Sequence, residues 1–360
     1  SGGGGDSGSD GRTIRQGYLL PLTGDLGSLG TAMRDAGMMA TAQVQDADIG
    51  ISVETQEEDT QTEVPAAIDG ANALVNSNFP MMVGSATSNI EIGNRVFVPN
   101  GMLACSPSNT LPTLSTFDDD DLFFRTTPGD AQQGAVLARI ASERLDASSA
   151  SVLYLNNAYG SGLADGFAEA FENQFDGTGP AKVSFEAERS SYTSQLDSVL
   201  ADDPDTFLVV GYPASGVQIF RDFYANYDGD MPVLVADGLQ DSALPGDVGQ
   251  DMSNVSGTAP SGQGPGLETF NSLYSEAFDA DPAGQPFIKQ AYDAAAALVL
   301  ANAAAGENAG TAVRESLRPV TSSGGTEVTA DNLVEGVETV PEGAVEVTRL
   351  QDEGYAYIRP

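Results

Sequence analysis

Short apolar runs alternate with segments of helical period along most of the chain. Four runs fall in the first third and four more between residues 150 and 236, at 18–20, 51–53, 81–83, 102–104, 152–155, 183–185, 207–210 and 233–235. Each gap can hold a crossover helix, which is typical of βαβ units around a buried parallel sheet. Since 360 residues also exceed what one core usually organises, the pattern predicts an α/β fold with two doubly wound parallel-sheet lobes.

Several segments between and after these runs have the composition of buried helices. In the second series the apolar side chains recur every three or four residues, at Leu163, Phe167, Phe171, Phe175, Val217, Phe220 and Tyr224. That spacing predicts stripes that face the core. Segment 291–305 is nearly all apolar and Ala-rich, which predicts a buried helix, and the Gly/Pro/Ser-rich segment 256–266 is expected to cross between lobes or to lie beside a crossing.

The charge balance is strongly acidic, with 52 Asp and Glu against 15 Lys and Arg and a formal net charge of -37. This excludes the basic footprint of a nucleic-acid-binding protein. Self-repulsion of this size is largely screened at molar salt, where the Debye length is about 3 Å, so the composition indicates a halophilic protein. The acidic run 118–121 lacks the spacing of a calcium loop and is predicted to be a solvated loop without metal.

The chain lacks the residues that most catalytic mechanisms require. The chain has no histidine, which removes Ser-His-Asp and Cys-His catalysis and His-ligated zinc. Neither Lys182 nor Lys289 lies in a phosphate-binding loop, the glycines at 24–30 do not match the dinucleotide spacing, and Cys105 has no cysteine or histidine partner. The sequence therefore predicts a protein that is not an enzyme and needs no cofactor.

Residues 1–11 contain only Gly, Ser and Asp, and we expect them to form a flexible linker before the first strand. Such a leader resembles a lipoprotein just after its lipidated cysteine, although a cloning boundary through an interdomain linker would look the same. We therefore expect a signal peptide that has been removed and a lipid anchor at the extracellular face of the membrane. No apolar stretch approaches the roughly 20 residues that span a bilayer.

Several short segments after the predicted strands carry a family resemblance. They are 21–24 (PLTG) with 29–30 (LG), 83–88 (VGSATS), 105–110 (CSPSNT), 124–127 (FRTT) with Asp130 and Gly134, 159–160 (YG), 211–212 (GY) and 236–238 (ADG). In kind and order they resemble the type I periplasmic binding proteins of ABC transporters, in the branched-chain amino-acid or amide-binding branch. The resemblance covers most of the chain and weakens after Leu333.

The resemblance implies two lobes that are joined by three crossovers and close on a small ligand. The expected division is a linker at 1–11, lobe 1 at 12–127 plus 254–332, and lobe 2 at 128–253 plus 333–360. The matched segments then lie at the carboxyl ends of parallel strands, where open α/β sheets bind ligands.

The resemblance also implies a ligand site. Hydroxyl and N–H groups of lobe 1 would hold the ligand's carboxylate, an acid of lobe 2 its ammonium group, and two tyrosines would cover it, while a leucine replaces a frequent aromatic wall. The residues, in that order, are Ser88, Ser108 and Thr110, then Asp237, then Tyr159 and Tyr212, then Leu29. Each has a structural alternative, such as a helix cap, a turn or a surface aspartate.

Together these observations predict an extracytoplasmic solute-binding protein that captures a branched-chain amino acid and passes it to the permease of an ABC importer. An amide- or urea-binding protein and a free sensor or receptor remain alternatives, because the same scaffold serves all three.

Overall fold

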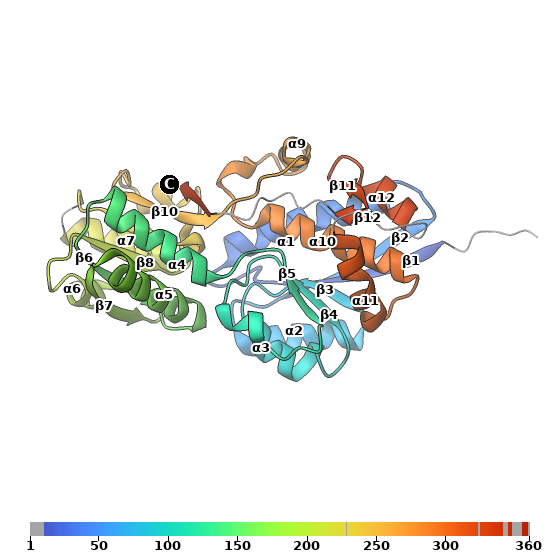
Figure 1. Ribbon diagram of the computed structural model, residues 1–360, viewed down its shortest axis with the longest axis horizontal. Helices are drawn as coiled ribbons and strands as arrows, with labels where there is room; N and C mark the ends of the chain where they lie inside the picture. Colours follow the sequence, from blue (N-terminus) through green and yellow to red (C-terminus); the bar gives the residue numbers. More distant parts are fainter. Residues whose placement is uncertain (1–10, 228, 323–324, 341–344, 348–354, 359–360) are drawn as a thin grey trace, which may run out of the picture.

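Each lobe is built on its own parallel sheet, as the computed structural model shows for residues 11–227, 229–322, 325–340, 345–347 and 355–358 (Figure 1). In lobe 1 the strand order is β2-β1-β3-β4-β5, and all four neighbouring pairs are parallel. The strands are β1 (Arg12–Leu20), β2 (Ile51–Asp59), β3 (Met81–Gly84), β4 (Leu103–Ser106) and β5 (Phe123–Arg125). The four apolar runs of the first third all fall within or beside these strands.

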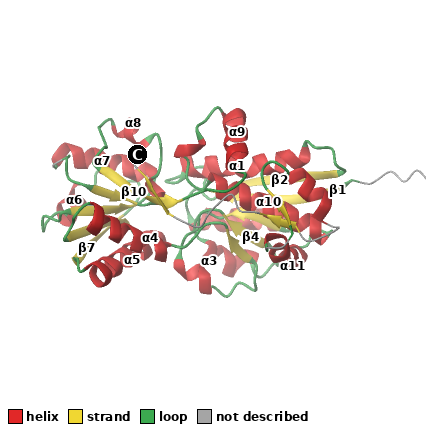
Figure 2. Cartoon of the chain, turned by 45° about the horizontal axis from the view of Figure 1, so that its top comes forward, coloured by secondary structure: helices red, strands yellow, loops and turns green. Residues whose placement is uncertain are grey.

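Helices cover both faces of the lobe 1 sheet (Figure 2). On one face α1 (Gly27–Gln45) packs against α10 (Ile288–Ala305), and α2 (Val64–Asn76) packs on the other. The predicted buried helix is α10, in which nearly every residue from Ala291 to Ala303 is buried. The remaining elements of this lobe are α3 (Asn89–Ile92), α9 (Leu267–Phe278), α11 (Gly310–Thr321), α12 (Leu333–Thr339) and the two short strands β11 (Thr326–Val328) and β12 (Val345–Val347).

The lobe 2 sheet has five parallel strands in the order β10-β9-β8-β6-β7, with antiparallel β13 beside β10. They are β6 (Ser149–Leu155), β7 (Thr178–Phe185), β8 (Thr206–Val210), β9 (Val233–Val235), β10 (Val255–Pro260) and β13 (Tyr355–Ile358). The helices are α4 (Asp130–Arg139), α5 (Ala158–Phe175), α6 (Thr193–Val199), α7 (Pro213–Asn226) and α8 (Leu244–Val248). The predicted stripe on α5 is buried at Leu163, Phe167 and Phe171 and packs against α4 and the sheet. The predicted fold class, two doubly wound parallel-sheet lobes, is thereby confirmed.

The chain passes between the lobes three times. It crosses from β5 to α4, from β10 to α9, and again between β12 and β13, where residues 348–354 lie outside the described part. Two details differ from the expected division. Residues 255–260 form β10, whose backbone pairs with β9, so they lie in lobe 2 and not in lobe 1. Leu333 and Val337 of α12 are buried and α12 contacts α1 and α10, so 333–339 lies in lobe 1.

No helix among the described residues is long and apolar enough to cross a membrane. No group of three or more His, Cys, Asp or Glu side chains among them is placed to hold a metal ion. The acidic run 118–121 lies against α11, where Arg318 pairs with Asp121 and the Arg314 guanidinium donates to the Asp120 carbonyl at 3.1 Å.

Candidate binding cleft

A cleft of about 960 Å³ lies between the lobes, and both lobes contribute to its lining. All seven residues that the resemblance singled out line it: Leu29, Ser88, Ser108, Thr110, Tyr159, Tyr212 and Asp237. Each follows the carboxyl end of a parallel strand, as the first turn of a helix or a connecting loop, which is where open sheets leave a crevice. The structure thus brings the predicted residues together, while their part in binding stays a prediction.

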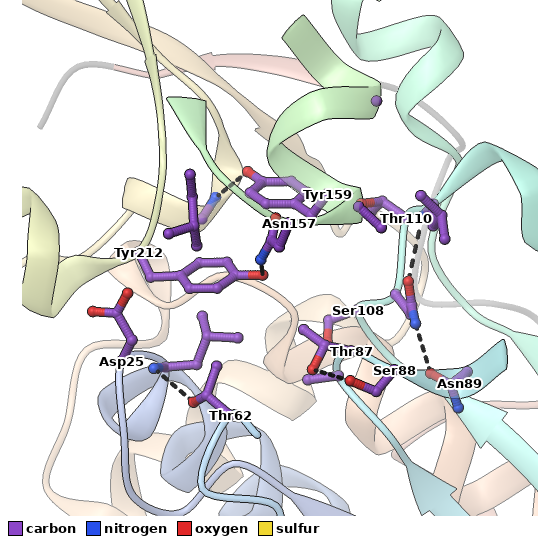
Figure 3. A pocket seen from close by; sticks show the side chains of 18 of the residues that line it. Asp25, Thr62, Thr87, Ser88, Asn89, Ser108, Thr110, Asn157, Tyr159 and Tyr212 are labelled. Carbon is purple, nitrogen blue, oxygen red and sulfur yellow. Dashed lines mark hydrogen bonds between the residues drawn. The ribbon is translucent and has the colours of Figure 1, made fainter. Parts of the chain in front are cut away.

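Lobe 1 presents hydroxyl groups to the cleft; we call Thr87, Ser88, Ser108 and Thr110 the hydroxyl wall (Figure 3). The Ser108 hydroxyl oxygen is buried without a hydrogen-bond partner. Ser88 stands at the N-cap of α3, but its side chain makes no capping hydrogen bond and its backbone is left-handed, with φ 63°. A helix-capping role for Ser88 is therefore not seen, and its hydroxyl meets only Thr87 Oγ1, at 3.5 Å. All four side chains are neutral, and the unpartnered Ser108 hydroxyl is available to an anionic group.

Lobe 2 presents two stacked tyrosines (Figure 3). The rings of Tyr159 and Tyr212 lie 5.5 Å apart and 10° from parallel. The Tyr159 hydroxyl donates to Asp237 Oδ1 at 3.3 Å and accepts from the Gly238 N–H at 3.2 Å. Asn157 caps α5 by accepting from the Gly160 N–H at 2.8 Å, and its amide donates to the Tyr212 hydroxyl at 3.3 Å. The start of α5 therefore fixes both rings.

Two carboxyl groups lie buried behind the tyrosines. Asp237 is 3% exposed and Asp130, in the first turn of α4, is 1% exposed. The Thr110 side chain faces Asp130 and partly offsets the effect of burial on its pKa, but neither carboxylate oxygen of Asp130 has a well-formed hydrogen bond. Burial, and after it the charge of Asp237, raises the pKa of Asp130, and burial raises the pKa of Asp237 against the opposing effect of its hydrogen bonds. Two poorly solvated acids so close together favour a cation, which would neutralise both. We call Asp130 and Asp237 the carboxyl pair.

The cleft also has an apolar end, formed by Leu29 and Met33 of α1 with Phe287 before α10. Leu29 is 2% exposed and Phe287 is 5% exposed. Phe287 has a left-handed backbone, with φ 61°, an uncommon conformation for an aromatic residue that often marks a functional site. Met33, Phe287 and Asp130 were not among the predicted site residues. Only Asp130 had a signal, since it stands in one of the matched segments.

The electrostatics of the lining are one-sided. Acids line it at Asp25, Glu63, Glu91, Asp165, Glu186, Glu188 and Asp237, and no Lys or Arg is among the described residues that line it. These acids would repel a ligand with a net negative charge. They would attract a cation or the positively charged group of a zwitterion.

Comparison with known proteins agrees with this geometry. A family model described as periplasmic binding protein matches residues 13–344. The chemotactic signal transduction system substrate-binding protein BasB of Halobacterium salinarum is 27% identical over 345 residues, which cover 92% of this chain and 80% of that protein. The Leu/Ile/Val-binding protein homolog 3 of Brucella melitensis is 27% identical over 234 residues, 62% of this chain and 61% of that protein.

A solved structure shares the fold at lower identity. The branched-chain amino acid transporter substrate-binding protein LivJ of Streptococcus pneumoniae, in complex with isoleucine, superposes with a TM-score of 0.73 at 22% sequence identity. The match covers 97% of this chain and 100% of that one. At this identity the likeness establishes the two-lobed fold.

Proposed function

Because the chain belongs to the periplasmic binding protein family, we propose that it captures a branched-chain amino acid between its lobes and delivers it to the permease of an ABC importer. Members of this family are substrate-binding proteins and not enzymes, and they act outside the cytoplasm on small-molecule ligands. The observation that carries the proposal is the opposite chemistry of the two walls, with neutral hydroxyl groups on lobe 1, of which the buried Ser108 hydroxyl has no partner, and a buried acid, Asp237, on lobe 2.

A zwitterion matches this arrangement. The carboxylate would accept from Ser88, Ser108 and Thr110, and the ammonium group would donate to Asp237. The side chain would then extend toward Leu29, Met33 and Phe287, whose apolar surface suits a branched aliphatic group. Tyr159 and Tyr212 would cover the ligand and exclude water, which strengthens each polar contact.

Sensing is the second candidate, because the relative from Halobacterium salinarum carries the name of a chemotactic binding protein. The same capture step would then signal to a membrane partner. An amide ligand fits less well than a zwitterion, since it would leave the carboxyl pair without a full positive charge. The halophilic character, the signal peptide and the lipid anchor stay predictions from composition and from residues 1–11, of which 1–10 lie outside the described residues.

The test is a calorimetric and thermal-shift screen in multi-molar KCl. L-leucine, L-isoleucine and L-valine would be compared with leucinamide, which lacks the carboxylate, and 4-methylpentanoate, which lacks the ammonium group. An amino acid at a hundred times its Kd would stabilise the protein by about 2.7 kcal/mol. The proposal predicts that both truncated analogues bind at least tenfold more weakly. Equal binding of leucinamide and L-leucine would contradict the zwitterion site.

A further inference from the structure

One side chain of lobe 1 reaches across the cleft to the opposite lobe. Asp25, in the loop between β1 and α1, accepts from the Ser215 N–H at 2.9 Å and from the Ser215 hydroxyl at 3.0 and 3.1 Å. Ser215 lies in the first turn of α7 in lobe 2. Both side chains are buried, since Asp25 is 6% exposed and Ser215 is 2% exposed. This contact therefore forms only when the two lobes come together.

The contact completes a helix end that its own lobe leaves incomplete. The N-cap residue of α7 is Tyr212, and its side chain makes no capping hydrogen bond. The first N–H groups of a helix lack partners within the helix, and they favour an acidic group because the helix dipole is positive at this end. Asp25 supplies that group from lobe 1. Figure 3 shows Asp25 close to Tyr212, the residue from which the helix starts.

The loop that carries Asp25 is held firmly on lobe 1. Gly24 has φ 82°, and a Cβ at this position would lie 2.2 Å from the Gln61 carbonyl oxygen, so only glycine fits. On the other side, the Leu26 N–H donates to the Thr62 hydroxyl at 3.1 Å. Because both neighbours are fixed, the Asp25 carboxylate is presented to lobe 2 by a rigid loop and needs little further ordering on closure.

We propose that Asp25 is a cross-lobe positioning residue, which caps α7 in the closed protein and thereby holds Tyr212 over the ligand. Ligand affinity then depends on Asp25, although in the proposed binding mode this side chain does not contact the charged groups of the ligand. The inference rests on the proposed function for its ligand but not for the lobe contact itself. Burial raises the pKa of Asp25, its hydrogen bonds with Ser215 lower it, and Glu188 of lobe 2, which also lines the cleft, raises it to a smaller extent.

The first experiment needs no ligand. Nitroxide labels on Asp69→Cys in α2 and Ser198→Cys in α6, both at exposed positions, report the lobe separation by pulsed electron resonance, and the native Cys105 is buried. Asp25→Ala is expected to shift the distance distribution toward longer separations. Asp25→Asn, which keeps an acceptor oxygen for the Ser215 N–H, restores most of the short distances. Asp202→Ala removes the same charge at an exposed position and serves as the control. An unchanged distribution in Asp25→Ala overturns the inference.

The second experiment measures binding kinetics with L-leucine in multi-molar KCl. Loss of hydrogen bonds to a charged group predicts dissociation about tenfold faster in Asp25→Ala, with association changed much less. Ser215→Ala combined with Asp25→Ala in a double-mutant cycle shows whether the two act as one unit. Additive effects, or slower association at unchanged dissociation, contradict the inference. If no variant binds L-leucine while Asp25→Ala still opens the lobes, the ligand assignment fails and the cross-lobe contact stands.

Discussion

The two walls of the cleft differ in charge and in how far their polar groups are already satisfied. The hydroxyl wall of lobe 1 is neutral, and its Ser108 hydroxyl lacks a partner although it is buried. The carboxyl pair of lobe 2 is acidic and is only partly stabilised by the Tyr159 hydroxyl. Burying an unpartnered hydroxyl costs little compared with burying two acids. The carboxyl pair is therefore the less stable half of the unliganded site and the half that gains most from a ligand.

Asp237→Asn is expected to have the largest effect on binding. The substitution keeps the shape of the side chain but leaves a buried ammonium group without its main counter-charge, a loss of about 3 kcal/mol or more. L-leucine affinity should fall at least a hundredfold by calorimetry. Asp202→Asn, at an exposed position, serves as the control. If Asp237→Asn binds L-leucine as tightly as the native protein, the ammonium subsite lies elsewhere.

The pH dependence of stability tests the carboxyl pair without a ligand. Since burial raises the pKa values of Asp130 and Asp237, the folded state holds protons that the unfolded chain has already released above the ordinary value of 3.8. The contribution of these two groups to the stability of the unliganded protein should therefore be fully present below that pH. It should fall as the pH rises, until both groups ionise in the folded protein. Thermal unfolding across pH would measure this fall.

Asp130→Asn separates the contribution of one member of the pair. Replacing this buried acid by a neutral amide should raise the melting temperature at pH 7 and flatten the pH dependence, because the cost of burying an ionisable carboxyl group and, to a smaller extent, the repulsion of Asp237 disappear. L-leucine binding should weaken far less than in Asp237→Asn, because Asp130 is buried and is not among the described residues that line the cleft. A variant that is destabilised at pH 7 would show that Asp130 has a structural role instead.

Ser108→Ala tests the opposite wall, where a smaller loss is expected. The unliganded protein should be unaffected or slightly stabilised, because the buried Ser108 hydroxyl has no partner to lose. L-leucine binding should weaken about five- to tenfold, the size of one hydrogen bond to a charged group. The control is Ser198→Ala on the exposed face of α6. Weaker folding with unchanged affinity would mean that Ser108 serves the loop and not the ligand.

Features that are local in sequence could be predicted, whereas contacts between distant segments could not. Eight of the strands and the buried α10 followed from apolar runs, which are local in sequence, and the seven lining residues came from the family resemblance that short motifs at strand ends carry. Met33 lies in α1 and Phe287 directly before α10, and apolar spacing says only that such residues are buried, not which of them reaches the cleft. The contact between Asp25 and Ser215 joins residues 190 positions apart, and nothing local distinguishes Asp25 among 52 acids. The placement of β10 and α12 likewise depended on pairing partners and not on composition.

The smallest effect is expected from a second hydrogen bond between the lobes. Ser28 Oγ of lobe 1 donates to Asp241 Oδ2 of lobe 2 at 3.0 Å. Unlike the Asp25 contact, this hydrogen bond is exposed to solvent. Water competes for an exposed hydrogen bond and salt screens its charge, so such contacts contribute at most about 1 kcal/mol. Asp241→Ala should therefore change the dissociation rate of L-leucine less than threefold, against about tenfold for Asp25→Ala. If the two variants behave alike, burial does not set the strength of lobe contacts, and the whole edge of the cleft, not Asp25 in particular, holds the lobes together.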